Sequence, residues 1–244
     1  MFYQKQPAGI LPPNPPLTHP VHQILDTNPT ADAVASSSPV NVFDDSHTTW
    51  IANRIAFTIP DFLSAAECAS LINHAEQIGF EKALLNVGYG RQILDETHRK
   101  SMRCIIDSVP LTAAIFARIK PYVPQTIKGH ELVCVNERLR ILKYNPGDKF
   151  EAHFDGAFRR LDGSEVSILT LQLYLNDVTE GGDTTFFNDS WDPIAAVKCS
   201  PGKAVVFSHN FLHEGSEIVS GVKYAVRTDI MYRTRPSRPN PVSK

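Results

Sequence analysis

Cysteine pairs and an excess of charge of either sign are both lacking in this sequence, and each absence excludes a class of protein. The four cysteines, Cys68, Cys104, Cys134 and Cys199, contain no CxxC pair, so neither a zinc knuckle nor a dense disulfide framework is expected. We predict reduced, mostly buried thiols in a cytoplasmic protein, with a nuclear location left open. The formal charge of −2 gives no electrostatic reason to expect nucleic acid as the main partner.

Long apolar runs are also missing. No run approaches the length needed to cross a bilayer, and the N-terminus lacks a charged start followed by an apolar core. We therefore expect neither a membrane partner nor secretion by a Sec-type route. The apolar fraction of 42% is that of an ordinary soluble globule, and 244 residues are enough for one well-buried domain with appendages.

Proline is concentrated at the start of the chain. Eight of the 18 prolines precede residue 49, and the same segment contains a small, polar stretch, Ala35–Ser38. Such a composition cannot bury enough apolar surface to offset its ordering entropy. We predict a disordered Pro/Ser-rich tail over residues 1–48, one domain over residues 49–235, and a short C-terminal tail over residues 236–244.

Two helices are predicted in the first half of this domain. Ser64 and Glu67 have the spacing of a capping box, and Gly79 is placed to end the helix that follows. A second helix is expected from Pro110, at a first-turn position, to a point before Pro124. Neither helix carries a chemical motif, so we expect both to buttress a sheet.

From about residue 132 the apolar pattern takes the period of strands. Alternation over Leu139–Tyr144, a nearly continuous run over Ile168–Leu175, and the segments Ala204–Phe207 and Tyr224–Tyr232 are separated by Gly- and Pro-containing turns. The fold class predicted is mainly β with supporting α-helices, around a double-stranded β-helix (jelly-roll) core. Such cores host metal sites on their inner faces.

The tripeptide His153-Phe154-Asp155 is the first candidate for chemistry. Side chains at positions i and i+2 of an extended segment point to the same face, so His153 and Asp155 can bind one metal ion from one side. A third ligand from a distant strand completes a two-histidine, one-carboxylate face, the arrangement of non-haem Fe(II) oxygenases. A His-x-Asp tripeptide alone is a weak signal.

Longer segments around the tripeptide strengthen its interpretation as part of a metal site. Tyr144–Asp155 resembles the Tyr-x-x-Gly-x-x-aromatic-x-x-His-x-Asp segment of the prolyl 4-hydroxylase family of Fe(II)/2-oxoglutarate dioxygenases. Downstream, Pro201–Phe207, His213–Gly215 and Gly221–Lys223 are similar to the distal-histidine region of that family. The resemblance covers roughly residues 55 to 233.

The resemblance implies an enzyme that hydroxylates an unactivated C–H bond while 2-oxoglutarate is decarboxylated to succinate. Its cofactors would be Fe(II), held by His153, Asp155 and His213, and 2-oxoglutarate, with ascorbate as reductant. Asp155 favours hydroxylation, because related halogenases lack this carboxylate. His209 is the rival of His213, but only His213 is followed by Glu-Gly and by a lysine ten positions later.

The distal carboxylate of 2-oxoglutarate needs a cation behind the metal. Lys223 matches the lysine of prolyl 4-hydroxylases in its Gly-x-Lys setting and is the favoured anchor. Arg227, four residues on and on the same face of a strand, is the rival and is otherwise expected to pair with Asp155. Tyr144 and Tyr174 are candidate hydroxyl donors to the cosubstrate, or else core tyrosines.

Substrate selection is predicted only in outline. The loops Gly88–Arg103 and Gly156–Glu165 should frame the open side of the metal, where Arg159, Arg160 and Arg99 are candidate substrate contacts. The substrate is either peptidyl or a small molecule, and the oligomeric state is not determined. Two alternatives stay open: a non-catalytic jelly-roll binding module, and a zinc hydrolase that uses the same three ligands.

Overall fold

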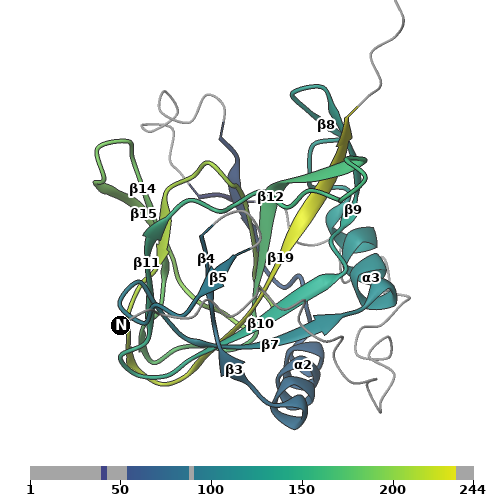
Figure 1. Cartoon of the computed structure of the whole chain (residues 1–244). Helices are drawn as coiled ribbons and strands as arrows, with labels where there is room; N and C mark the ends of the chain where they lie inside the picture. Colours follow the sequence, from purple (N-terminus) through teal and green to yellow (C-terminus); the bar gives the residue numbers. More distant parts are fainter. Residues whose placement is uncertain (1–39, 43–53, 88–90, 235–244) are drawn as a thin grey trace, which may run out of the picture.

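The computed structural model describes residues 40–42, 54–87 and 91–234, which form two facing β-sheets with two helices outside them (Figure 1). The major sheet has the strand order β1 (Val40–Asn41), β2 (Ala56–Ile59), β16 (Ala204–Ser208), β12 (Glu165–Tyr174), β19 (Lys223–Thr234), β10 (Arg138–Tyr144), β7 (Met102–Asp107) and β3 (Glu81–Lys82). Strand β9 (His130–Val135) also pairs with β19, and β8 (Thr126–Ile127) pairs with β9.

The minor sheet supplies the wall opposite the major sheet. Its order is β15 (Pro193–Val197), β14 (Thr184–Phe187), β17 (His213–Gly215), β11 (Lys149–His153) and β6 (Arg99–Lys100). Two small ribbons pair β13 (Glu180–Gly181) with β18 (Ile218–Ser220) and β4 (Leu85–Asn86) with β5 (Gln92–Ile93). Neighbouring strands within the two sheets pair in the antiparallel sense, as expected for a jelly roll.

Alternation along the central strands gives the major sheet two different faces. On β12, Leu169, Leu171 and Leu173 are fully buried in the core that also contains the helices. Tyr174 points the other way, into the cluster between the two sheets. Because side chains alternate along a strand, one sheet both closes the helical core and lines the interior of the roll.

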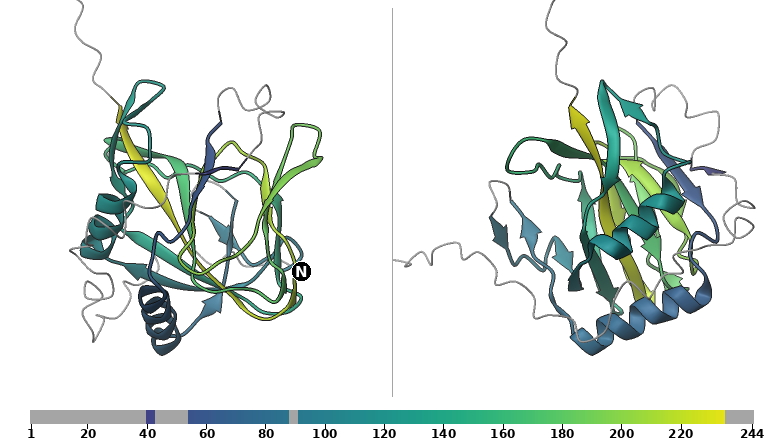
Figure 2. Two further views of the ribbon diagram at one scale, coloured as in Figure 1. Left: turned by 180° about the vertical axis from the view of Figure 1, so that it is seen from behind. Right: turned by 90° about the vertical axis from the view of Figure 1, so that its right-hand side faces the viewer.

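Helices α2 (Ala65–Ile78) and α3 (Val109–Ile119) cover the outer face of the major sheet (Figure 2, right). The predicted capping box is present: Ser64 accepts a hydrogen bond from the Glu67 backbone N–H, and the Glu67 side chain accepts one from the Ser64 N–H. Gly79 ends α2 at φ 95°, and Ser108 caps α3 before Pro110. The predicted supporting role of both helices is confirmed by their shared core with the sheet.

The predicted fold class is confirmed, and the boundaries differ in two places. Strand β1 pairs with β2 through Val40 and Thr58, so regular structure begins inside the range predicted as a tail. The rest of that range and residues 236–244 lie outside the described residues. Within the predicted loop Gly88–Arg103, β5, β6 and the start of β7 form strands. All four cysteines are unpaired, as predicted.

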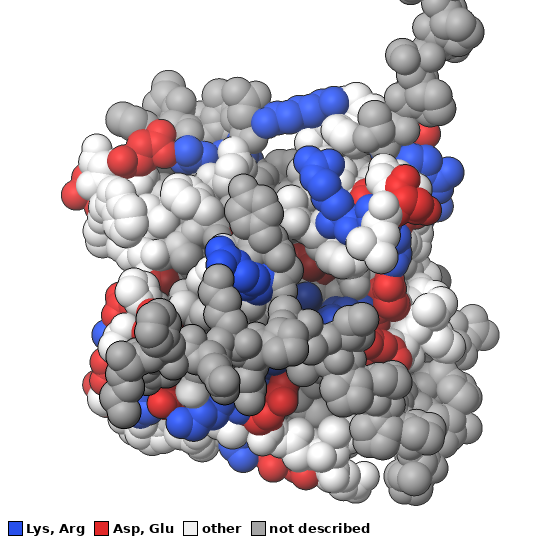
Figure 3. Space-filling model, viewed as in Figure 1, with Lys and Arg blue, Asp and Glu red and all other residues white. Residues whose placement is uncertain are grey.

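The surface agrees with the expected absence of one dominant charge. On the face shown in Figure 3, Lys and Arg side chains are interspersed with Asp and Glu side chains. Among the described residues, no helix combines the length and the apolar character that crossing a membrane requires.

Candidate active site

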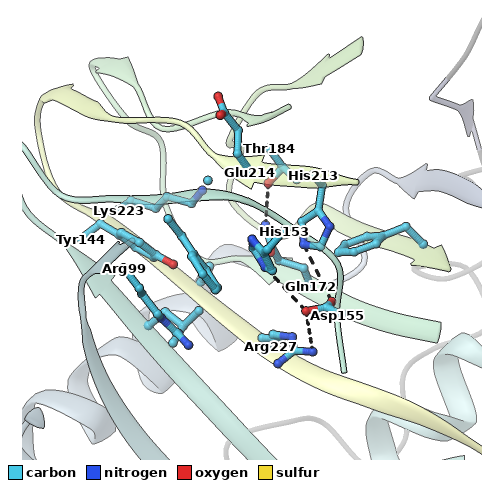
Figure 4. Close-up of a pocket in the computed structure, with 15 residues that line it drawn as sticks. Arg99, Tyr144, His153, Asp155, Gln172, Thr184, His213, Glu214, Lys223 and Arg227 are labelled. Atoms are coloured by element: carbon cyan, nitrogen blue, oxygen red, sulfur yellow. Dashed lines mark hydrogen bonds and ion pairs between the residues drawn. The ribbon is translucent and has the colours of Figure 1, made fainter. Parts of the chain in front are cut away.

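His153, Asp155 and His213 meet between the two sheets (Figure 4). His153 ends β11 and lies directly opposite His213, the first residue of β17, in the antiparallel pairing of these strands. Asp155 follows two residues after His153. One nitrogen from each imidazole and one oxygen of the carboxylate all lie within 4.8 Å of one another, the one such group in the described part of the chain.

Hydrogen bonds to the backbone orient both imidazoles. Nδ1 of His153 lies 2.7 Å from the Glu151 carbonyl oxygen, and Nδ1 of His213 lies 2.9 Å from that of Phe211. A carbonyl only accepts, so each Nδ1 carries the proton and each Nε2 presents a lone pair. The Nε2 atoms lie 3.7 and 3.8 Å from the two Asp155 oxygens, beyond hydrogen-bond distance. This donor set fits a divalent metal such as iron.

The protonation states also suit metal binding. Burial lowers the pKa of His153 to about 3, and burial likewise lowers the pKa of His213, so both rings are neutral at pH 7. Burial alone would raise the pKa of Asp155, but the Arg227 charge, the two neighbouring imidazoles and the hydrogen bond from Thr170 outweigh it and lower this pKa well below its usual range. Two neutral nitrogens and one carboxylate are therefore available without loss of a proton.

Contacts around the three ligands fix their positions. Arg227 Nη2 lies 2.8 Å from Oδ1 of Asp155, and the Thr170 hydroxyl donates a hydrogen bond to Oδ2. The ring of Phe150 stacks on His153 at a centroid distance of 3.6 Å, and Phe207 packs edge-on against His213 at 4.5 Å. Each carboxylate oxygen keeps a lone pair for a metal while its orientation is held from behind.

Lys223, on β19, lines the same pocket and is 3% exposed. Its Nζ donates a hydrogen bond to the Gly182 carbonyl at 2.6 Å and lies over the rings of Tyr144 and Tyr174 at 5.5 and 5.3 Å. No carboxylate within the described ranges lies at ion-pair distance from Lys223. Because a buried charge without a partner is costly, this position is suited to an anionic ligand.

The two candidate tyrosines occupy different places. Tyr144 lines the pocket, whereas Tyr174 is fully buried and does not. The Tyr174 hydroxyl donates to Thr184 Oγ1 at 2.6 Å, and Gln172 Nε2 donates to the same oxygen at 2.9 Å. Since Thr184 accepts twice, its own proton remains to be donated. Tyr174 thus orients Thr184 and is not placed to contact a ligand itself.

Thr184 and Gln172 line the pocket, and sequence reasoning did not select either of them. The turn Gly181-Gly182, which precedes Asp183 and Thr184, was a usable signal, because it resembles the corresponding turn of the family. No comparable signal marks Gln172, which is one of several polar residues in the mainly apolar strand β12.

Of the predicted substrate contacts, the structure brings only Arg99 to the pocket. Arg160 instead forms a bidentate pair with Glu137, at 2.7 and 2.8 Å, and a 3.0 Å contact with Glu165. Arg159 is exposed and forms a backbone bridge to Val166. Arg159 and Arg160 thus do not line the pocket: acidic neighbours hold Arg160, Arg159 is exposed, and their contact with a substrate stays a prediction.

His209, the rival ligand, lies apart from the three-residue group. Its Nε2 is 3.6 Å from Asp229 Oδ1, and its backbone carbonyl accepts a hydrogen bond from the Asp155 N–H at 3.1 Å. It therefore supports the position of Asp155 from the outside.

Comparison with known proteins agrees with this arrangement. Residues 139–228 match the family model described as the 2OG-Fe(II) oxygenase superfamily. Probable prolyl 4-hydroxylase 6 of Arabidopsis thaliana is 32% identical over 123 residues, which are 40% of this chain and 43% of that relative's length. Prolyl 4-hydroxylase 2 of the same plant is 25% identical over 219 residues, 78% of this chain and 71% of the relative. The chain thus spans less than half of the first of these relatives.

Solved structures share the fold at low sequence identity. A prolyl-4-hydroxylase from Pseudomonas putida has a TM-score of 0.56 at 18% identity, covering 78% of this chain and 98% of its own. A prolyl hydroxylase from Trichoplax adhaerens, in complex with a hypoxia inducible factor peptide fragment, has a TM-score of 0.58 at 14% identity, covering 87% and 94%.

The family match includes His153, Asp155, His213 and Lys223, the residues that the two facing sheets bring together in one pocket. Residues 139–228 thus match the 2OG-Fe(II) oxygenase superfamily, and the chain is similar to prolyl 4-hydroxylases in sequence and in fold.

Proposed function

We propose that the protein is an Fe(II)- and 2-oxoglutarate-dependent dioxygenase that hydroxylates an unactivated C–H bond. In this reaction one oxygen atom of O2 enters succinate as 2-oxoglutarate loses carbon dioxide, and the other enters the product as a hydroxyl group. One observation carries the proposal: three metal-binding atoms and a buried lysine, which has no acidic partner among the described residues, line one pocket. The metal and a dicarboxylate therefore have separate binding sites in one pocket.

His153, Asp155 and His213 would hold the iron from one side. Iron supplies open coordination positions for 2-oxoglutarate and dioxygen, together with the redox change of the reaction. The protein's own contribution is orientation: backbone carbonyls fix the proton on each Nδ1, and Arg227 and Thr170 hold the carboxylate. Ascorbate would act as the external reductant that keeps the metal in the Fe(II) state.

Lys223 is the proposed anchor for the distal carboxylate of 2-oxoglutarate. It is buried without an acidic partner in the described part of the chain, whereas the rival Arg227 already contacts Asp155 at 2.8 Å and Asp229 at 3.5 Å. The Thr184 hydroxyl, oriented by Gln172 and Tyr174, would donate to the same carboxylate. The Tyr144 ring lies 5.5 Å from the Lys223 ammonium group and lines the same pocket.

A prolyl residue in a peptide is the first substrate class to test, and a small molecule with a C–H bond of similar reactivity is the second. The names of the relatives support the first class, as does the peptide bound in the Trichoplax structure. Related folds accept varied substrates through their loops, so this class is a proposal for the present chain. The predicted cytoplasmic location is likewise a proposal, tested by imaging the tagged full chain.

The decisive experiment measures succinate. The full chain is loaded with Fe(II) without oxygen and then given 2-oxoglutarate, ascorbate, air and a library of prolyl peptides. We expect succinate formation and a peptide that gains the mass of one oxygen atom. His153→Ala, Asp155→Ala and His213→Ala should each abolish both products, whereas His98→Ala, an exposed histidine elsewhere, should retain them. Turnover that survives in Asp155→Ala would refute the proposed site.

The same assay separates the two alternatives. A binding module would take up metal without forming succinate at any substrate concentration. A zinc hydrolase would be active with Zn(II) and indifferent to 2-oxoglutarate. Dependence on Fe(II), dioxygen and 2-oxoglutarate together is expected only of the dioxygenase.

A further inference from the structure

Three arginines lie near the metal site, and we call them the guanidinium cluster: Arg99, Arg140 and Arg227. Arg140 and Arg227 are direct cross-strand neighbours on β10 and β19, so their side chains share the inner face of the major sheet. Arg99 belongs to β6 of the minor sheet, where it pairs with Phe150 of β11. Arg99 and Arg227 both line the pocket (Figure 4).

The hydrogen-bonding capacity of this cluster is largely unused. Arg99 is 8% exposed, yet its contacts are long ones to the Ser101 hydroxyl at 3.3 Å and the Leu84 carbonyl at 3.4 Å, and no acidic group of the described residues lies at ion-pair distance. Nη1 of Arg140 is buried and 3.7 Å from its nearest carboxylate, Asp229. Nε of Arg227 is buried without a hydrogen-bond partner. These are donors held in position without an acceptor.

Charge around the cluster is unbalanced in the positive direction. Among the described residues, only Asp155 and Asp229 face the three guanidinium groups, and Asp155 is also the proposed metal ligand. Glu214 lines the pocket too, but its carboxylate points away from the cluster in Figure 4 and accepts a hydrogen bond from Ser216. A metal dication and the 2-oxoglutarate dianion offset each other. The loaded site would therefore keep a surplus of positive charge.

The arginines also raise the energy of one another's charged form. Burial, followed by repulsion from Arg227, lowers the pKa of Arg140 to about 10. Burial is the main cause of the lowered pKa of Arg99 as well, with Arg227 among the neighbouring charges that lower it. An anion placed between these side chains would remove that repulsion.

We propose that the substrate carries a carboxylate group and that the guanidinium cluster binds it beside the metal. The inference rests on the proposed dioxygenase function and specifies its substrate class. Arginine suits this role because its planar donors match the two oxygens of a carboxylate. The cosubstrate does not fulfil it: Lys223 and Arg227 are four residues apart on one strand, about 13 Å along the backbone. A 2-oxoglutarate anchored at Lys223 would leave the end of the cluster formed by Arg140 and Arg227 free to bind another anion.

Binding to a form of the protein that cannot turn over provides the test. The full chain is loaded with Mn(II) and 2-oxoglutarate without oxygen, and calorimetry follows the addition of acid–amide pairs of probes. One arm uses N-acetylproline against N-acetylprolinamide. The other uses a short, C-terminally amidated prolyl peptide with Asp against the same peptide with Asn. These arms distinguish a free acid from a carboxylate within a peptide.

We expect the acid to bind at least tenfold more tightly than its amide in one arm. Arg140→Gln and Arg99→Gln should each reduce this preference to less than threefold. Because the Arg140 side chain is partly exposed, its replacement should not unfold the protein. Arg138→Gln, an exposed arginine on the same strand, removes the same charge and should keep the preference. Circular dichroism would verify the fold of each variant.

Equal binding of acid and amide, or no binding of any acid probe, would overturn the inference. Failure of the proposed function looks different, because Mn(II) and 2-oxoglutarate then fail to bind before any probe is added. Loss of 2-oxoglutarate binding in Arg140→Gln would also overturn the inference, because the cluster would then belong to the cosubstrate.

Discussion

Histidine protonation is decided in the folded protein before any metal arrives. His153 and His213 are each neutral because burial opposes the imidazolium form, and each has its proton placed on Nδ1 by a backbone carbonyl. In an exposed site a proton would compete with the metal below about pH 6.5. Here protons compete with the metal only at lower pH, because burial lowers the pKa of both histidines.

Metal affinity should accordingly vary little between pH 6 and pH 8. The lowered pKa values mean that neither imidazole gains a proton as the pH falls through 6.5, and protonation of His153 would become important only near its pKa of about 3. Titration of the metal-free protein with Mn(II) at pH 6, 7 and 8 measures this directly. A decline of about tenfold for each pH unit below 6.5 would contradict it.

Lys223 and Arg227 should differ in what their removal affects. Lys223→Met keeps most of the side-chain volume and removes a charged donor, so 2-oxoglutarate affinity should fall roughly 10- to 100-fold at unchanged metal affinity. Arg227→Met should instead weaken metal binding, because Asp155 loses its 2.8 Å partner. Calorimetry with Mn(II) and then 2-oxoglutarate measures both constants. The control is Lys203→Met, and a larger 2-oxoglutarate loss at Arg227 would reverse the assignment.

The sequence predicted the residues whose spacing along the chain is itself the signal. His153 and Asp155 lie two apart, and the ten-residue step between His213 and Lys223 recurs in the resembling family. The sequence did not show the pairing of Arg160 with Glu137, because Glu137 lies 23 residues away in the chain. The pairing of Arg140 with Arg227 depends on strand register, which a single sequence leaves undetermined.

Helices α2 and α3 are joined by one buried ion pair. Arg118 donates to both oxygens of Glu67, at 3.0 and 2.6 Å, and both side chains are largely buried. The same Glu67 side chain closes the capping box of α2. One carboxylate thus ties the start of one helix to the end of the other.

Arg118→Ala should destabilise the protein by about 3–5 kcal/mol, because it leaves the buried Glu67 carboxylate without its countercharge. Urea unfolding followed by circular dichroism gives the free energy of unfolding. The matched control is Lys82→Ala, which breaks an exposed pair with Glu96 and should cost less than about 1 kcal/mol. Similar losses of unfolding free energy in the two variants would show that the buried pair stabilises the protein no more than the exposed pair does.

Element prediction succeeded where several local signals coincide. The helix after Ser64 has a cap, an apolar stripe and a terminating glycine, and all three act in the structure. Strands β5 and β6 have two residues each, too few to show a period, and were predicted as part of a loop. Pairing of β6 with the longer strand β11 makes Arg99 a buried strand residue instead of a loop residue.

Gly202 forms backbone hydrogen bonds both to the major sheet and to the segment before α2. Its N–H donates to the Tyr174 carbonyl at 2.9 Å, and its own carbonyl accepts from the Leu63 N–H at 3.0 Å. The backbone there has φ +78°, and an added Cβ would lie 2.0 Å from the Leu63 carbonyl oxygen. This glycine connects the segment before α2 to the central strands of the major sheet.

Gly202→Ala should therefore destabilise the whole domain more than a glycine replacement at a comparable φ in open space. Gly163→Ala, at φ +73° with no atom within 4 Å, should cost only about 1–2 kcal/mol for the left-handed backbone. Gly202→Ala should exceed that cost by at least about 2 kcal/mol, since backbone atoms must move apart. Thermal unfolding of the two variants side by side measures the difference, and equal melting temperatures would contradict it.

The proposed metal ligands belong to β11 and its following residues and to β17 in the minor sheet, whereas Lys223 belongs to β19 in the major sheet. A molecule chelated to the metal at one end and held by Lys223 at the other thus acts as a removable cross-link between the two sheets. Its binding energy adds to their cohesion. The lifetime of the protein in a cell would then follow the supply of 2-oxoglutarate, because a copy deprived of it unfolds, and is degraded, more readily.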